Sequence, residues 1–104
     1  MNERELLELA AKAAGIPLKP DFAERFDYYM ADRLMWNPLT DDGDALRLAV
    51  KLNLVVSCAY GMSAAVIETG AHEDVAEFHH ESDPYAATRR AITRAAAEIG
   101  KGME

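Results

Sequence analysis

The sequence has little of what would cross-link the chain or place it in a membrane. Its one cysteine, Cys58, has no second thiol for an intramolecular disulfide or for the common cysteine-rich metal sites. No apolar run approaches about 18 residues, the length expected of a membrane span. Residues 1–5 lack the basic-then-apolar order of a signal peptide. We therefore expect a soluble protein with no membrane contact, in a reducing compartment such as the cytoplasm.

Basic residues are scarce as well. The chain has 11 basic and 18 acidic residues, a net charge of −7, and residues 52–88 contain no lysine or arginine. This balance disfavours direct nucleic-acid binding, because phosphate recognition depends on lysine and arginine. Instead it predicts an acidic surface that binds another protein, formed by Glu68, Glu73, Asp74, Glu77 and Glu81.

What is present is the composition of a globular protein. Half of the 104 residues are hydrophobic and 28% are charged, which is too apolar for a disordered chain. One ordinary domain has about 100–150 residues, so residues 1–104 are predicted to form a single domain.

The first predicted helix covers residues 3–14 and ends at Gly15, since glycine tolerates the left-handed conformation of a helix terminus. Its expected apolar stripe is Leu6, Leu9, Ala10 and Ala13. A second helix is expected from about Asp41, capped by Thr40. Apolar residues surround most of this second helix, which predicts that it is the most buried one.

A third helix is predicted to start at Ser82-Asp83-Pro84 and to end at Gly100. Its expected inward residues are Tyr85, Thr88, Ile92, Ala95, Ala96 and Ile99. Before it, residues 54–60 and 63–69 are rich in valine and small residues and predict a β-hairpin with Gly61-Met62 as its turn. The polar residues 70–82 are expected to form a connection with a short turn at 75–78.

Residues 22–36 allow two interpretations. In one, residues 25–30 and 33–36 form a hairpin around Ala31 and Asp32; in the other, the whole segment is a helix. Its aromatic residues are candidates for a protein-binding patch, the composition enriched at binding hot spots, or for a hydrophobic core. The candidate binding residues are Phe26, Tyr28, Tyr29 and Trp36.

Two stretches, residues 36–48 (WNPLTDDGDALRL) and 83–92 (DPYAATRRAI), together resemble a recurring group of small phage and prophage proteins, the phage ABA-sandwich domain. With the first helix, the resemblance covers roughly two thirds of the chain. It implies an α+β fold in which about three helices pack against a small antiparallel, hairpin-based sheet, sandwich-like. It implies no chemistry, but it makes a bacterial host cell the expected location.

Several clusters have both a structural and a chemical interpretation. Asp41, Asp42 and Asp44 fit helix capping better than a cation loop. The histidines His72, His79 and His80 lack the spacing of a zinc-binding helix motif. We expect Cys58 to be a small core residue rather than a nucleophile. The three arginines of the last helix are expected to be surface charges.

The predicted function is therefore non-catalytic. We expect a phage or prophage accessory protein that contacts a host or phage protein through its acidic surface. Inhibition of a host factor is one form that this contact can take. No cofactor and no metal are expected. Two alternatives stay open. One is a small ligand-binding, metal-binding or enzymatic domain that uses the aspartate or histidine cluster, and the other is a structural oligomer such as a homodimer.

Overall fold

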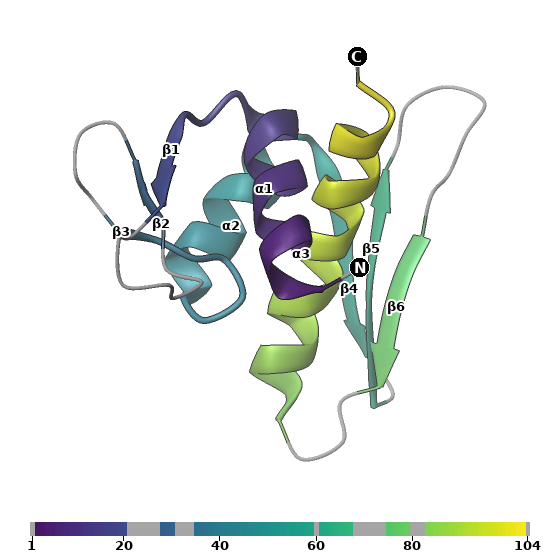
Figure 1. Cartoon of the computed structure of the whole chain (residues 1–104). Helices are drawn as coiled ribbons and strands as arrows, with labels where there is room; N and C mark the ends of the chain where they lie inside the picture. The colour runs from purple at the N-terminus through teal and green to yellow at the C-terminus, as the bar shows by residue number, and fades with distance from the viewer. Residues whose placement is uncertain are drawn as a thin grey trace.

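A computed structural model of the chain shows three helices and six strands among the residues that it describes (Figure 1). Those residues are 2–20, 28–30, 35–59, 61–67, 75–79 and 83–103. The helices are α1 (Glu3–Ala14), α2 (Asp42–Lys51) and α3 (Pro84–Lys101). The Cα radius of gyration, 13.1 Å, is that of a compact chain of this length. Three helices in a compact chain are as predicted.

Side-chain caps fix where α1 and α3 begin. The Asn2 side chain accepts a hydrogen bond from the backbone N–H of Glu5 at 2.8 Å, and Gly15, at φ 70°, ends α1 as predicted. The Asp83 carboxylate accepts from the backbone N–H of Ala86 at 3.0 Å, and proline follows it at the start of α3. None of the helices described is long and apolar enough to cross a membrane.

The cap of α2 is Asp41, so the prediction of Thr40 was wrong by one residue. The Asp41 carboxylate accepts from the backbone N–H of Asp44 at 2.8 Å. Thr40 belongs to the preceding turn, in which its own N–H and that of Asp41 both donate to the carbonyl of Asn37. Because this turn is one residue longer than the sequence suggested, the helix begins one residue later.

The larger sheet has the strand order β4-β5-β6 and is antiparallel throughout. Its strands are β4 (Leu54–Ala59), β5 (Met62–Ile67) and β6 (Val75–His79). The predicted hairpin is confirmed by the pairing of β4 with β5. Its turn is one residue earlier than predicted, because Met62 already pairs with Ala59.

The strand β6 corrects the prediction that residues 75–78 form a turn in a polar connection. This strand pairs with β5 over its full length, from Val66↔Val75 to Met62↔His79. In its sequence, Glu77 and His79 alternate with apolar residues, which is the period of a strand. The pattern is short, and the surrounding acidic residues obscured it.

The smaller sheet has the order β1-β2-β3 and is also antiparallel. It consists of β1 (Leu18–Pro20), β2 (Tyr28–Met30) and β3 (Met35–Trp36). The pairing Tyr28↔Trp36 favours the hairpin interpretation for β2 and β3, and the helix is wrong for these five residues. Residues 22–27 and 31–34 lie outside the described part of the chain.

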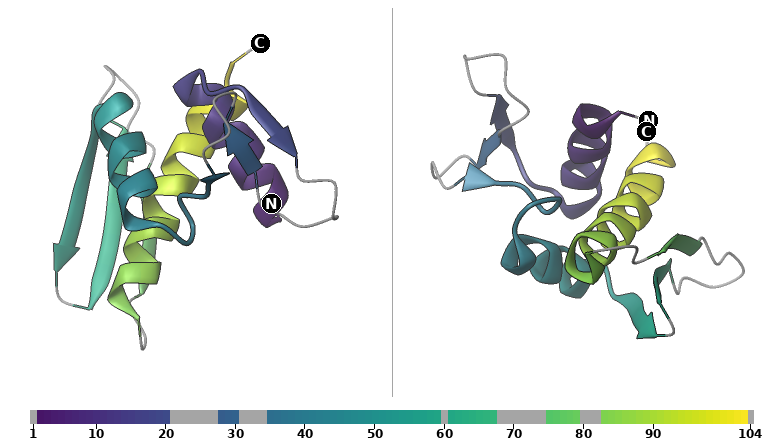
Figure 2. Two further views of the ribbon diagram at one scale, coloured as in Figure 1. Left: turned by 90° about the vertical axis from the view of Figure 1, so that its left-hand side faces the viewer. Right: turned by 90° about the horizontal axis from the view of Figure 1, so that it is seen from below.

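Helix α3 is the centre of the packing. It lies between α1 and the sheet β4-β5-β6, with α2 beside it (Figures 1 and 2). Most of its length is buried, and the central residues are Ala91, Ile92, Thr93, Ala95, Ala96 and Ala97. Leu7 of α1, Trp36 of β3 and Leu48 of α2 complete the core around it. The many alanines of α3 let its neighbours approach closely on several sides.

Gly100 lies inside α3, whereas the sequence predicted that it ends the helix. It is buried, and a Cβ atom added there would overlap the backbone carbonyl oxygen of Leu9 in α1 and lie 2.8 Å from the carbonyl carbon. The glycine is therefore present because two helix backbones touch at this point. Helix α3 continues to Lys101, and Gly102 follows it.

The buried faces of α1 and α2 differ in part from those predicted. In α1, Leu6 and Ala10 are buried as predicted, whereas Leu9 and Ala13 are only partly buried. Leu7, Ala11 and Ala14 are buried in addition. Helix α2 is not the most buried, because Leu46 is 63% exposed and Val50 is 68% exposed. A short helix beside a larger neighbour can bury only one side. Of these two exposed apolar residues, Leu46 lines the candidate site.

Candidate functional site

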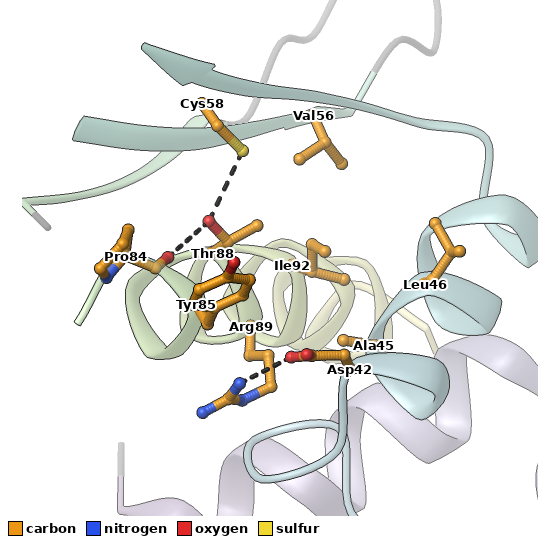
Figure 3. Close-up of a pocket in the computed structure, with 10 residues that line it drawn as sticks. All are labelled: Asp42, Ala45, Leu46, Val56, Cys58, Pro84, Tyr85, Thr88, Arg89 and Ile92. Carbon is orange, nitrogen blue, oxygen red and sulfur yellow. Dashed lines mark hydrogen bonds and ion pairs between the residues drawn. The ribbon is translucent and has the colours of Figure 1, made fainter. Parts of the chain in front are cut away.

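An apolar groove of about 560 Å³ lies where α2, α3 and β4 meet (Figure 3). Val56 and Cys58 point from β4 toward α3, and Leu46 stands on α2 at one end of the groove. Helix α3 supplies the opposite wall, with Tyr85, Thr88 and Ile92. Side chains from three separate elements therefore surround one hollow.

The groove is bordered by large apolar side chains that solvent reaches. Tyr85 is 69% exposed, Leu46 is 63% exposed and Val56 is 36% exposed. The sequence predicted that Tyr85 faces inward, which is wrong: it lies at the first turn of α3, beyond the end of the packed core. Adjacent exposed apolar residues that border a hollow mark binding sites more often than single ones do.

The charged residues of the groove neutralise each other. The Arg89 guanidinium donates from Nη1 to Oδ1 of Asp42 at 2.6 Å and from Nε to the carbonyl oxygen of Leu39 at 2.9 Å. The Arg89 side chain is only 17% exposed, so this arginine joins α3 to α2 and is not the ordinary surface charge that was predicted. The groove thus presents one internal ion pair.

Cys58 is exposed, which corrects the prediction that it is a core residue. Its sulfur lies 3.5 Å from the hydroxyl oxygen of Thr88, and that hydroxyl donates to the carbonyl of Pro84 at 2.8 Å. The thiol can therefore donate to Thr88. A cysteine nucleophile usually needs a neighbouring base, and the described residues that line the groove include no histidine.

The three aspartates of α2 each have a protein partner. Asp41 caps the helix, and Asp42 binds Arg89. Asp44 is 6% exposed and accepts hydrogen bonds from the backbone N–H of Asn37 at 2.9 Å and from Arg47 at 2.7 Å. The part of the chain that the structure describes contains no group of three or more metal-binding side chains. Capping by Asp41, the ion pair of Asp42 and the buried hydrogen bonds of Asp44 account for these aspartates.

Replacing Asp44 with alanine is expected to lower the free energy of unfolding by about 1–3 kcal/mol, because it leaves the partly buried Asn37 amide without an acceptor. The control is Glu8→Ala, which removes a half-exposed carboxylate paired with the half-exposed Arg4 and is expected to cost less than about 1 kcal/mol. Urea unfolding followed by circular dichroism measures both. Equal losses for the two variants would contradict the structural role assigned to Asp44.

The predicted site residues fall in different places. Trp36 is 3% exposed and packs in the core, which favours the core interpretation over the binding patch for this residue. Tyr28 and Tyr29 lie in β2, and Glu77 and His79 lie in β6. The remaining candidates lie outside the described residues: Phe26, Glu68, His72, Glu73, Asp74, His80 and Glu81.

Sequence reasoning did not identify the groove. The one available signal was α2, where apolar residues surround the helix more completely than ten residues beside one neighbour can bury. That excess was interpreted as deep burial instead of as an exposed patch. Comparisons of the chain with family models, with curated proteins and with solved structures find no match.

Proposed function

We propose that this chain is a sandwich-like α+β domain without catalytic activity, and that it acts by binding another protein through the groove between α2, α3 and β4. One observation supports this most: Leu46, Val56 and Tyr85 expose apolar surface from three elements around one hollow of about 560 Å³. Exposed apolar surface of this kind is stabilised when a partner covers it.

The polar groups of the groove favour a polypeptide over a small polar ligand. Small-molecule sites usually direct several polar groups at the ligand. Here Arg89 is bonded to Asp42 and to a backbone carbonyl, and the Thr88 hydroxyl is bonded to Pro84. The surface left for a ligand is therefore mainly apolar, as at the centre of protein–protein interfaces.

The acidic surface predicted from the sequence has a different role in this proposal. Glu77 is its one member among the described residues, and the net charge of the chain is −7. Acidic residues around an apolar contact raise the association rate with a basic partner and make it dependent on salt. The proposal also includes a role as a phage or prophage accessory protein in the bacterial cytoplasm, for example as an inhibitor of a host factor. This part rests on the sequence resemblance.

The proposal is tested with a displayed library of random 12-residue peptides, selected on the immobilised protein. We expect enriched peptides whose synthetic forms bind the wild-type protein and bind Leu46→Asp at least about tenfold more weakly, because the charge would have to be desolvated in the contact. Isothermal titration calorimetry measures both affinities.

The matched control is Val55→Asp. Val55 neighbours Val56 but is exposed on the other face of β4 and does not line the groove, so this variant should bind like the wild type. Recovering no enriched peptide, or finding that Leu46→Asp binds as well as the wild type, would refute the groove as a protein-binding site.

A further inference from the structure

Strand β4 is an edge strand of its sheet. It pairs with β5 on one side, and among the described residues no strand pairs with its other side. In the left panel of Figure 2, β4 lies at the outer border of the sheet, next to α2. An edge strand presents a row of backbone N–H and C=O groups that a further strand can pair with.

The register identifies which backbone groups point outward. Ala59 pairs with Met62 across a two-residue turn, and the closing pair of such a hairpin is a hydrogen-bonded one. Because hydrogen-bonded pairs alternate along an antiparallel ladder, the backbone groups of Leu54, Val56 and Cys58 face the free edge. Val56 and Cys58 are also the residues whose side chains line the groove.

The edge lacks the features that usually protect such strands. Natural edge strands carry lysine, proline, inward charges or bulges that discourage pairing. The six residues of β4, LVVSCA, contain no charge and no proline, and they pair with β5 without a bulge. The groove thus adjoins a row of hydrogen-bonding groups that no residue of β4 itself protects from pairing.

We infer, building on the proposed function, that the groove binds an extended polypeptide segment, which adds to the sheet as a strand along the free edge of β4. Backbone hydrogen bonds to Leu54, Val56 and Cys58 hold the segment, and every second side chain enters the groove between Leu46 and Tyr85. This is the chemistry of strand addition, in which the backbone contributes affinity and pockets for alternate side chains contribute specificity.

The groove indicates what the segment contains. Its volume of about 560 Å³ suits large apolar side chains at positions i and i+2, and its charged residues already neutralise each other. A helix would fit less well, because its backbone groups are bonded internally and cannot pair with the edge.

A second copy of this chain fits the groove poorly. Its own β4 would offer Val56 and Cys58, which are small for the groove, and each copy carries a net charge of −7 that opposes close approach. The segment is therefore assigned to a different protein.

The test uses the enriched peptide and the variant Val56→Pro. Proline at this position removes an amide that faces the free edge and leaves the pairing with β5 intact, the situation in which proline is tolerated in an edge strand. We expect Val56→Pro to keep the wild-type circular dichroism spectrum and melting temperature. It should bind the peptide up to about tenfold more weakly than Val56→Ala, which also shortens the side chain in the groove but keeps the amide, because proline loses one hydrogen bond.

A second measurement does not depend on how the variant folds. The peptide is synthesised with a single N-methyl group at each position in turn, and each form is titrated against the wild-type protein. Strand addition predicts that alternate N-methylations abolish binding and that the intervening ones do not, because only every second amide faces β4.

The outcomes separate the two proposals. Period-two loss on N-methylation, with weaker binding to a folded Val56→Pro than to Val56→Ala, supports strand addition. Binding that Leu46→Asp weakens, but that shows no period of two, overturns strand addition and leaves the proposed function standing. Binding that is indifferent to Leu46→Asp overturns both. A wild-type dimer in light scattering that Val56→Pro converts to a monomer would assign the edge to a second copy, and it would overturn the assignment to a different protein.

Discussion

Replacing Gly100 with alanine is expected to lower the free energy of unfolding by about 3 kcal/mol, even though alanine is the better helix former by about 1 kcal/mol. The added Cβ would overlap the carbonyl oxygen of Leu9 and lie 2.8 Å from its carbonyl carbon. Both obstacles are backbone atoms of α1, so no side-chain rotation can relieve the contact. The helices must separate, and the packing between α1 and α3 loosens along its length.

The control for Gly100→Ala is Gly102→Ala. Gly102 follows α3 with φ −80°, and the nearest atom to an added Cβ is a backbone oxygen of Ile99 at 3.6 Å, an ordinary contact. This variant should change stability by no more than about 0.5 kcal/mol. Urea denaturation of the two variants measures the difference. If Gly100→Ala were as stable as Gly102→Ala, α1 and α3 could not approach as closely as described.

Replacing Leu48 with alanine is expected to cost about 2–5 kcal/mol, the range for a buried leucine whose removal leaves a cavity. Leu48 is 2% exposed and packs in the main core with Trp36 and Leu7. The same change at Leu46, on the same helix but 63% exposed, should alter stability by less than about 0.5 kcal/mol.

Thermal and urea unfolding of the two α2 variants compare a buried leucine with an exposed one of the same type. The sequence interpretation, in which α2 is buried on nearly all sides, predicts large losses for both. Two large losses would mean that Leu46 is covered, and the groove would then have no open end at α2.

The end of α1 and the start of α3 could be predicted because their signals are local. Gly15 ends α1, and Asp83 followed by Pro84 starts α3, in each case through groups within four residues along the chain. The hairpin of β4 and β5 is equally local, since a two-residue turn and two valine-rich runs specify it. Tertiary packing was not needed to identify any of these.

Which side of each element is buried depends on neighbours that are distant in sequence. Leu46 and Leu48 are both leucines of one helix, and only the position of α3 makes one exposed and the other buried. Cys58 looked like a core residue because its strand is apolar, but it lies on the edge strand, beside the open groove. The groove could not be predicted, since it exists only where three separate elements converge.

The pairing of α1 with α3 has a consequence for how the chain is synthesised. The helix nearest the start of the sequence packs chiefly against the last one, and the Lys12 ammonium donates to the carbonyl of Met103 at 2.9 Å. Until residues 84–103 have left the ribosome, the apolar face of α1 around Leu7 lacks the helix that buries it. Contacts between segments so distant in sequence also form slowly. A nascent chain that stalls before α3 emerges would expose the apolar face of α1, and exposed apolar surface of this kind is what chaperones bind.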